Sequence, residues 1–307
     1  MKKPSTLQLV FGSFVGIVNN RYIKPSIYLP TRVGKYELVS EIQKDKPDKK
    51  YGTGVYKKGR KKFFIKTWNG TVRDYDYYSL VNEYLYSRVL SRAANRSDSL
   101  TDSLRIRFPN PVAIYQKEHT TSVVYEFIDG VGVDTLTKSK EVKLLSTAIE
   151  GLSTLTGSLT KTELDTFSKR NIVFYLFTLP IFTVLALLFN RDKWRVILKS
   201  FVICIKNIKI SKEQLRLAHG DLHPGNLILT SKNGIQNLYI LDCENMVMTY
   251  PDYDLSLLTL DPQFKQITKG ISEKLKYPAS TFLMTYIGIH CAVTDKDIFL
   301  TKFLESL

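Results

Sequence analysis

The spacing of apolar residues changes near residue 130, and this change narrows the folds open to the chain. Apolar residues in the first part alternate in short runs, which predicts strands at residues 36–42, 54–58, 62–67, 112–115 and 122–127. A helix is predicted over residues 75–94. After Asp129-Gly130 the spacing becomes helical, and a later hairpin is expected to turn at Asn233-Gly234. A small sheet with one helix, followed by a mostly helical part, predicts an α+β fold with two lobes.

Three segments are expected along the chain. Residues 1–35 form an N-terminal extension, in which Pro25 and Pro30 indicate irregular structure. Residues 36–128 form a small, β-rich N-lobe, and residues 129–307 form a larger, mostly helical C-lobe. With 307 residues, of which 44% are hydrophobic, the chain is long enough to bury a sizeable core.

The net charge of +15 is concentrated in three basic segments. Residues 1–35 carry +6, residues 44–66 carry +8 and residues 191–212 carry +6, which leaves −5 on the rest of the chain. A positive field favours phosphates, acidic membranes or nucleic acids as partners and disfavours a small polycationic substrate. Because the charge is local and no nucleic-acid-binding motif is present, we expect no nucleic acid partner.

The cysteines predict neither disulfides nor a metal site. Cys204, Cys243 and Cys291 are three in number, lie far apart and lack the spacing of metal ligands. A reducing compartment is therefore expected, which places the protein in the cytoplasm.

Two carboxylates and an amide follow one another closely in a single stretch of sequence. This stretch reads His219-Gly-Asp-Leu-His-Pro-Gly-Asn226 and, after the predicted hairpin, Leu241-Asp-Cys-Glu244. Phosphoryl transfer needs an acid group that orients the attacking hydroxyl and oxygen ligands that hold Mg²⁺ on the phosphates. The spacing supplies this set, with Asp221 accepting the hydroxyl proton and with Asn226 and Asp242 binding the metal.

These motifs resemble those of the aminoglycoside phosphotransferase and choline kinase family, which has a protein-kinase-like fold. The family's catalytic loop reads His-Gly-Asp-x-x-x-x-Asn, and its metal-binding segment, typically Ile-Asp-x-x, corresponds to Leu241-Asp-Cys-Glu244. A third family pattern, Pro-x-x-Asp-Leu-Ala, is similar to Pro251-Asp-Tyr-Asp-Leu-Ser256. The resemblance implies a kinase that uses ATP and Mg²⁺ and has an alcohol group as its acceptor.

The resemblance also implies that the N-lobe clamps the nucleotide. Lys66, at the end of the run Lys62-Phe-Phe-Ile-Lys66, would bind the phosphates, and Glu83 in the following helix would pair with it. In the segment that resembles the family's hinge, the Glu126 carbonyl and the Ile128 amide would face the adenine base. The alternative for Lys66 and Glu83 is that both are solvated surface charges.

The loop that would cover the phosphates matches the family least well. Residues 44–54 include Tyr51-Gly-Thr-Gly54, which is not a complete G-x-G-x-x-G motif. Under the resemblance Gly52 and Gly54 belong to the phosphate loop, and the alternative is a turn at the edge of a strand.

Other kinase classes match less well. Asp242 is followed by Cys-Glu, and Pro251 comes nine residues after Asp242, which leaves no room for the activation segment of a eukaryotic protein kinase. The kinases of quinone biosynthesis share the His-Pro-Gly-Asn loop, but their Lys-x-Gly-Gln motif is not found in residues 1–35. A lipopolysaccharide-type sugar kinase remains an alternative, as does a nucleotide-binding pseudokinase or membrane-associated scaffold.

An uncharged apolar run from Ile172 to Phe189 raises the question of a membrane. Its 18 residues are the minimum for a span. Site residues lie before and after it and must share one side of a membrane, which opposes a single span. A buried helix pair is favoured, and an interfacial element beside the basic segment Arg191-Asp-Lys-Trp-Arg195 is the main alternative.

The sequence thus predicts a phosphotransferase whose acceptor is a hydroxyl of a small molecule or of a lipid or sugar headgroup. A monomer or dimer in the cytoplasm is expected, with peripheral contact at the inner face of the membrane as one alternative.

Overall fold

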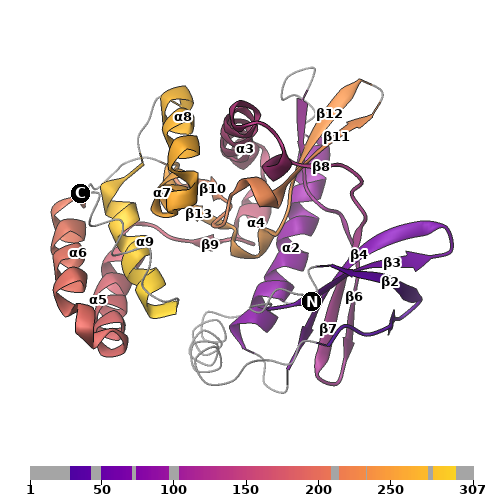
Figure 1. Cartoon of the computed structure of the whole chain (residues 1–307), viewed down its shortest axis with the longest axis horizontal. Helices are drawn as coiled ribbons and strands as arrows, with labels where there is room; N and C mark the ends of the chain where they lie inside the picture. Colours follow the sequence, from indigo (N-terminus) through magenta and orange to yellow (C-terminus); the bar gives the residue numbers. More distant parts are fainter. Residues whose placement is uncertain are drawn as a thin grey trace. The chain divides into compact units, whose positions relative to one another are not determined.

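The chain divides into two compact units, each described here by itself (Figure 1). The computed structural model describes residues 28–42, 50–70, 74–96, 104–208, 214–232, 234–275 and 279–294. Unit 1 runs to Val131 and includes Ile228–Asn245, whereas unit 2 comprises Gly132–Leu227 and the residues from Met246 onward. Most of the expected N-terminal extension, residues 1–27, lies outside the described residues.

Unit 1 is built on a six-stranded antiparallel sheet with the strand order β1-β2-β3-β4-β7-β6. The strands are β1 (Arg32–Val33), β2 (Tyr36–Ile42), β3 (Gly52–Lys58), β4 (Lys61–Asn69), β6 (Pro111–Lys117) and β7 (Thr120–Glu126). The predicted strands are confirmed, because alternating runs rich in β-branched and aromatic residues fit a pleated, half-buried sheet.

The alternation of side chains in β4 decides which residues face helix α2 (Tyr75–Arg96). Ile65 packs with Tyr56 and Val124 in a cluster that also contains Val33 and Tyr36. Trp68 packs in a second cluster with Leu80 of α2 and with Val123 of β7. Lys66 pairs in register with Val123, and its parity in β4 is that of Trp68, so it lies on the face that α2 covers.

A second, four-stranded sheet has the order β5-β12-β11-β8. Its strands are β5 (Leu104–Arg107), β8 (Val131–Gly132), β11 (Leu227–Lys232) and β12 (Ile235–Ile240). The hairpin of β11 and β12 was predicted, and Gly234 in its turn has a positive φ of 77°, whereas Asn233 lies outside the described residues. The prediction placed residues 228–245 in the helical C-lobe, but they pack with the β-rich unit because β12 pairs in parallel with β5.

Unit 2 is mainly helical. Its described helices are α3 (Lys138–Ser158), α4 (Lys161–Leu164), α5 (Ile172–Phe189), α6 (Trp194–Lys206), α7 (Tyr253–Leu260), α8 (Lys265–Leu275) and α9 (Thr281–Thr294). A small sheet joins β10 (Arg216–Ala218), β13 (Val247–Thr249) and β9 (Ser168–Lys169) in that order. The structure therefore has a β-rich N-terminal part and a helical C-terminal part, as the sequence predicts.

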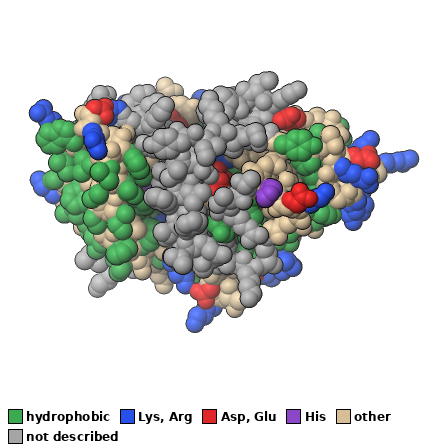
Figure 2. Space-filling view, turned by 90° about the horizontal axis from the view of Figure 1, so that it is seen from below, with side chains coloured by type: hydrophobic (Ala, Val, Ile, Leu, Met, Phe, Trp, Pro, Cys, Tyr) green, Lys and Arg blue, Asp and Glu red, His purple; other side chains and the backbone are tan. Residues whose placement is uncertain are grey.

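Helix α5 is buried on one face and exposed on the other. The buried face is formed by Tyr175, Leu179, Thr183 and Ala186. Apolar side chains on the opposite face are exposed, and Figure 2 shows hydrophobic side chains gathered over α5 and α6 at the left of the view. In the described part of the chain this is the one helix long and apolar enough to cross a membrane, and 22% of it is buried. The favoured prediction of a buried helix pair is therefore wrong for the exposed face of α5.

Candidate active site

Lys66 lies at the centre of a cluster of three carboxylates in unit 1. Its Nζ donates to Glu83 Oε2 at 2.8 Å, to Asp242 Oδ1 at 2.5 Å and to Glu244 Oε2 at 3.0 Å. The ring of Tyr51 covers the ammonium, with its centroid 4.2 Å from Nζ. The lysine and Glu83 are both buried, with side chains 8% and 6% exposed. The predicted pairing of Lys66 with Glu83 is confirmed, and neither residue is a solvated surface charge.

Different elements bring these groups together. Glu83 lies on the face of α2 that packs on the sheet, opposite Lys66 of β4. Asp242 follows β12 and has a positive φ of 57°. Few side chains tolerate this left-handed conformation, and aspartate is among them. The turn carries the chain into the single 3₁₀ turn η4 (Cys243–Asn245), which presents Glu244 on the same side.

The cluster contains more negative than positive charge, and this shifts the pKa values of its members. Burial alone would lower the pKa of Lys66, but Asp242, Glu244 and Glu83 raise it well above its usual value. Burial raises the pKa of Glu83 to about 7; Lys66 opposes this rise, and the two neighbouring carboxylates add to it. Lys66 is therefore fixed in its charged form at neutral pH.

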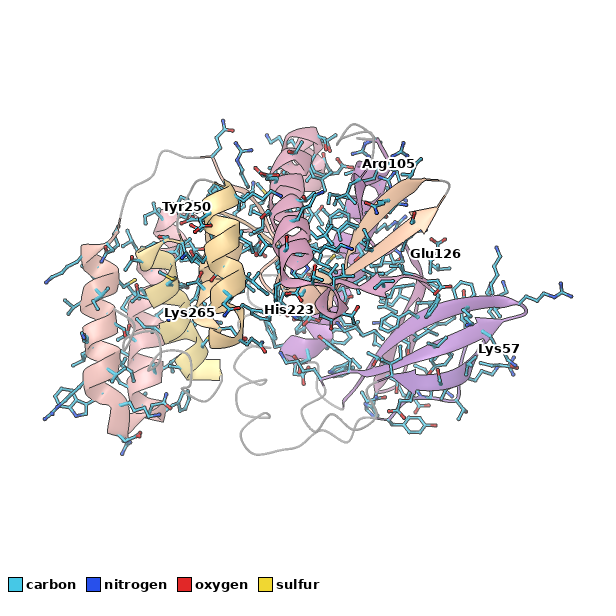
Figure 3. All side chains as sticks on the ribbon, turned by 45° about the horizontal axis from the view of Figure 1, so that its top comes forward. Lys57, Arg105, Glu126, His223, Tyr250 and Lys265 are labelled. Carbon is cyan, nitrogen blue, oxygen red and sulfur yellow. The ribbon has the colours of Figure 1, made fainter. Side chains whose placement is uncertain are left out.

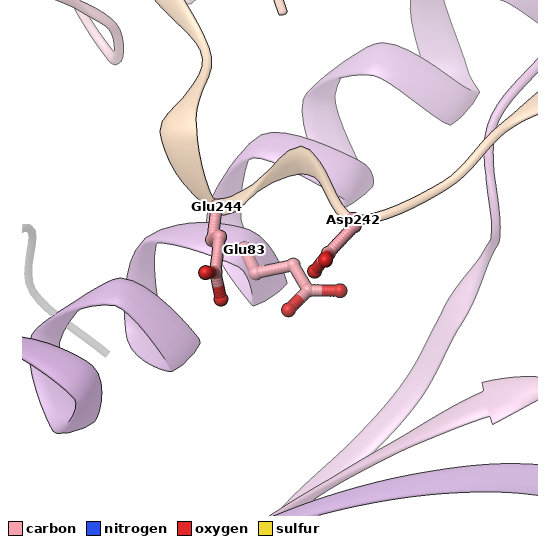
Figure 4. Close-up of side chains that lie close together, drawn as sticks. All are labelled: Glu83, Asp242 and Glu244. Carbon is pink, nitrogen blue, oxygen red and sulfur yellow. The ribbon is translucent and has the colours of Figure 1, made fainter. Parts of the chain in front are cut away.

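The same three carboxylates could hold a divalent cation. Figure 4 shows Glu83, Asp242 and Glu244 with their carboxyl groups turned toward one another, and one oxygen from each lies within 4.8 Å of the others. One ammonium against three carboxylates leaves a formal charge of −2, which a divalent cation would balance. Oxygen donors of this kind suit Mg²⁺.

The loop from His219 to Asn226 lies in unit 2, where helix α7 holds its backbone. Both carboxylate oxygens of Asp254 accept backbone bonds, from His219 N–H and from Gly220 N–H, each at 2.8 Å. Gly220 has a φ of 81°, which glycine adopts without strain. Burial raises the pKa of Asp254, whereas His219 and the two backbone bonds lower it. Asp254 thus fixes the residues that come immediately before Asp221.

Asp221 and Asn226 are linked within this loop. The Asn226 side chain donates from Nδ2 to the Asp221 carbonyl at 2.8 Å, which leaves its Oδ1 as the group suited to a metal. His223, which is labelled in Figure 3, accepts a bond from Gly225 N–H at 3.1 Å through Nδ1. Its ring stacks on that of Phe264, with centroids 6.1 Å apart. The imidazole therefore braces the turn that leads to Asn226.

A sequence model of the phosphotransferase enzyme family matches residues 88–268, more than half of the chain. The chain belongs to this family. It is therefore a phosphotransferase, and the matched range includes the loop with Asp221 and Asn226 as well as Asp242. No curated protein sequence matches it significantly.

Solved structures of aminoglycoside phosphotransferases have the same fold as this phosphotransferase. Spectinomycin phosphotransferase APH(9)-Ia, in complex with ADP and spectinomycin, has 15% sequence identity and a TM-score of 0.56, with 88% of each chain covered. A thermostable mutant of APH(4)-Ia in a ternary complex with ADP and hygromycin B has 11% identity and a TM-score of 0.57, over 82% of this chain and 85% of that one. The streptomycin–ATP–APH(2″)-IIa complex has 15% identity and a TM-score of 0.55, over 88% and 90%.

The residues predicted to contact adenine lie at the end of β7. Glu126 is the last residue of this strand and is exposed, and its N–H donates to the Asn110 carbonyl at 3.2 Å (Figure 3). Ile128 follows in irregular, half-buried backbone. The position after an interior strand agrees with a hinge segment, and the contacts with adenine stay a prediction.

The two glycines of the predicted phosphate loop are part of a strand. Gly52 and Gly54 lie in β3, where they pair with Thr67 and Ile65 of β4. A Cβ on Gly54 would lie 2.9 Å from Leu29 Cδ2 and 3.1 Å from the Ser40 carbonyl, so close packing explains this glycine. The rest of that loop, residues 43–49, lies outside the described residues.

Three residues of this arrangement received no role from the sequence. Glu244 stood in the quoted motif but was not assigned, although its position two residues after Asp242 was visible. Asp254 stood in the motif Pro251–Ser256, and its role in holding the loop depends on a contact between distant segments. Tyr51 gave no signal, because only the folded sheet places its ring over Lys66.

Proposed function

We propose that this phosphotransferase transfers the γ-phosphoryl group of ATP to an alcohol of a small molecule or of a lipid or sugar headgroup. The acceptor oxygen forms a bond to the γ-phosphorus while the bond from that phosphorus to the bridging oxygen breaks. The hydroxyl proton passes to the carboxylate of Asp221, and ADP leaves.

The buried Lys66 cluster is the observation that carries this proposal. A buried lysine costs free energy unless it is paired, and here three carboxylates hold it rigidly in its charged form. Such a cation is suited to bind the phosphates of ATP and to orient them, with Glu83 fixing its position. A structural core does not need a buried lysine with three carboxylates, so this cluster supports a functional role for Lys66.

Asp242 and Asn226 would hold Mg²⁺, and Glu244 adds a third oxygen donor next to Asp242. When bound, Mg²⁺ neutralises the phosphate charge that increases as the bridging bond breaks. The Nδ2 bond to the Asp221 carbonyl orients the Asn226 amide and couples the metal ligand to the loop of the proton acceptor.

Under this proposal the N-lobe, residues 36–128, clamps the nucleotide. The Glu126 carbonyl and the Ile128 amide bind adenine, and Gly52 allows β3 to approach the phosphates, whereas close packing accounts for Gly54. The C-lobe, residues 129–307, supplies the loop with Asp221 and the acceptor site.

The acceptor belongs to the class of compounds with several alcohol groups. The similar structures contain spectinomycin, hygromycin B or streptomycin, which supports a small polyol or sugar-like acceptor. The net charge of +15 favours a neutral or anionic member of this class over a polycationic one.

The test is an assay of ADP release with a panel of acceptors, with phosphorylated products identified by mass. Asp221→Ala should lower turnover by about 10²–10⁴-fold while nucleotide binding persists. The exposed Asp192→Ala is the matched control and should leave turnover unchanged. Undiminished turnover in Asp221→Ala would refute the mechanism, and ATP binding without transfer to any acceptor would favour the pseudokinase alternative.

A further inference from the structure

Helices α5 and α6 expose an apolar surface that the fold of unit 2 does not use. On α5 the exposed side chains are Val173, Leu176, Phe177, Ile181, Val184 and Leu188, and on α6 they are Trp194, Leu198, Val202 and Ile205. Phe177 is 71% exposed, Val184 56% and Trp194 49%. A contiguous apolar patch of this kind on a water-facing helix pair marks an interaction site.

The residues around this patch are mainly basic. Arg195, Lys199 and Lys206 are exposed on α6, and Arg191 lies in the 3₁₀ turn η2 (Arg191–Lys193) between the two helices. At about 100° per residue, the basic line 195–199–206 lies roughly 85° around α6 from the apolar line 194–198–202–205. The guanidinium of Arg195 lies 5.3 Å from the ring centroid of Trp194, so a cation and an aromatic ring are neighbours.

We propose that the α5–α6 face docks this protein on an anionic membrane surface. Apolar side chains would enter the boundary between headgroups and acyl chains, Trp194 would lie at headgroup depth, and the basic line would bind lipid phosphates. The inference is independent of the proposed phosphotransfer, because its evidence and its tests involve no catalytic residue.

The contacts of the buried face of α5 argue against a membrane span. Tyr175 Oη and Thr249 Oγ1 lie 2.6 Å apart, and Thr178 Oγ1 and Tyr286 Oη lie 2.7 Å apart. At the end of the helix, Asn190 donates from Nδ2 to the Ala292 carbonyl at 2.7 Å. If α5 left its neighbours in unit 2 and crossed the bilayer alone, it would lose all of these bonds, whereas a helix lying at the interface keeps them.

The charge of the patch argues against a second copy of the chain as the occupant. In a two-fold symmetric interface the same surface faces itself, so the basic line of one copy would approach that of the other. Arg191, Arg195, Lys199 and Lys206 outnumber the exposed Asp192 of η2, so the two copies would repel each other. An anionic lipid surface supplies the opposite charge along the whole face.

Trp194 provides a direct readout, because the chain has two tryptophans and Trp68 is buried at 5% exposure. The full chain is mixed with vesicles of phosphatidylcholine alone or of phosphatidylcholine with phosphatidylglycerol. The tryptophan emission should shift to the blue with the anionic vesicles, and the shift should be absent in Trp194→Phe. If the wild-type emission does not shift, the proposal is overturned. Coverage of this face by another part of the chain would give the same result and would also overturn it.

Two matched triple variants separate the apolar and basic contributions in a vesicle flotation assay. Phe177→Ser/Val184→Ser/Leu198→Ser should weaken binding to anionic vesicles by about tenfold or more. Arg195→Gln/Lys199→Gln/Lys206→Gln should weaken it by about fivefold per residue, or roughly a hundredfold in total. All six side chains are exposed, and the circular dichroism of the variants should match that of the wild type.

A control for the basic triple variant neutralises three cations outside the α5–α6 face. Lys58→Gln/Arg60→Gln/Lys61→Gln changes the net charge equally, at the exposed turn between β3 and β4. An equal loss of vesicle binding in this control would show non-specific attraction and overturn the proposal. Sedimentation that shows a dimer, which the serine triple variant converts to a monomer, would assign the face to a second copy instead.

Discussion

Lys66 combines a structural and a functional demand in one side chain. Its side chain is 8% exposed, and its ammonium neutralises part of the charge of Glu83, Asp242 and Glu244. Removing one member of a buried ion pair leaves uncompensated charge, which costs about 3–5 kcal/mol. Lys66→Met should therefore lower the free energy of unfolding by that amount at neutral pH, as measured by urea denaturation.

A matched control for Lys66→Met is available in β3, the strand that pairs with β4. Lys57 pairs with Glu37 at 4.0 Å with both side chains more than half exposed, and it extends into solvent (Figure 3). Exposed pairs contribute about 0–1 kcal/mol, so Lys57→Met should be nearly silent. The cost of Lys66→Met should also shrink toward acidic pH, where the carboxylates can protonate. Equal destabilisation by both variants would contradict the buried-charge account.

Asp76 in the first turn of α2 predicts a pH dependence of stability. Burial raises the pKa of this carboxyl to about 6 from its ordinary value of 3.8. Between these pH values the folded chain keeps a proton that the unfolded chain releases, so stability falls as the pH rises through this window. Asp76→Asn cannot titrate and should be more stable at neutral pH by up to about 3 kcal/mol.

Urea denaturation across this pH range tests that expectation. The wild type should lose stability as the pH rises, the Asp76→Asn curve should be flatter, and Asp76→Glu, which keeps a carboxyl, should retain the slope. Parallel curves for the wild type and Asp76→Asn would show that Asp76 does not titrate in this window.

The individual site residues were partly visible in the sequence. The pairing of Lys66 with Glu83 was implied by the family resemblance that the later motifs carry, and the run Lys62–Lys66 and the following helix supplied the two residues. Glu244 could not be assigned, because its approach to Lys66 follows from the left-handed backbone at Asp242, a conformation that a residue type permits but does not require.

At the scale of elements, helix α7 acts on the loop of Asp221 through one side chain. Asp254 is 4% exposed and accepts from two consecutive backbone N–H groups. Asp254→Asn replaces one acceptor oxygen with an NH₂ group that faces a donor, which leaves a buried N–H unpaired at a cost of about 1–3 kcal/mol. Turnover should fall at saturating ATP with little change in ATP affinity, because the variant displaces Asp221 and not the nucleotide contacts.

Thermal unfolding and steady-state kinetics check this expectation against Asp192→Asn, an exposed substitution of the same type. If Asp254→Asn loses stability but keeps its kcat, the contact of Asp254 with the loop supports only the fold. Unchanged stability and unchanged kcat would show that the two bonds are dispensable.

Elements with local signals were predicted well, and elements paired at long range were not. Five of the six strands of the main sheet and helix α2 follow from periodicity, whereas β1 lies in residues that were expected to be irregular. The parallel pairing of β5 with β12 joins segments more than 120 residues apart, and no local pattern encodes it. Helix α5 is a uniform run of apolar residues without a polar face, so periodicity could not show which of its faces is buried.

At the scale of the whole molecule, basic residues occur in both units. The turn between β3 and β4 carries Lys58, Arg60 and Lys61 in unit 1, and α6 carries its own basic line in unit 2. Under the two proposals, the basic residues of unit 1 serve nucleotide phosphates and those of α6 serve a lipid surface. Net charge alone could not have distinguished these uses.

The division into a nucleotide-binding part and a part that carries Asp221 predicts how ATP should stabilise the chain. A ligand that binds only the folded state stabilises it by RT ln(1 + [L]/Kd), about 2.7 kcal/mol at a hundredfold excess over Kd. ATP with Mg²⁺ should therefore raise the melting temperature of the wild type by a few degrees. Asp221→Ala should show the same rise, because Asp221 acts on the acceptor hydroxyl, whereas Lys66→Met and Asp242→Asn should show little or none. Chelation of Mg²⁺ should reduce the rise in the wild type and leave the residual response of Asp242→Asn unchanged. A full ATP response in Lys66→Met would place the nucleotide somewhere other than the Lys66 cluster.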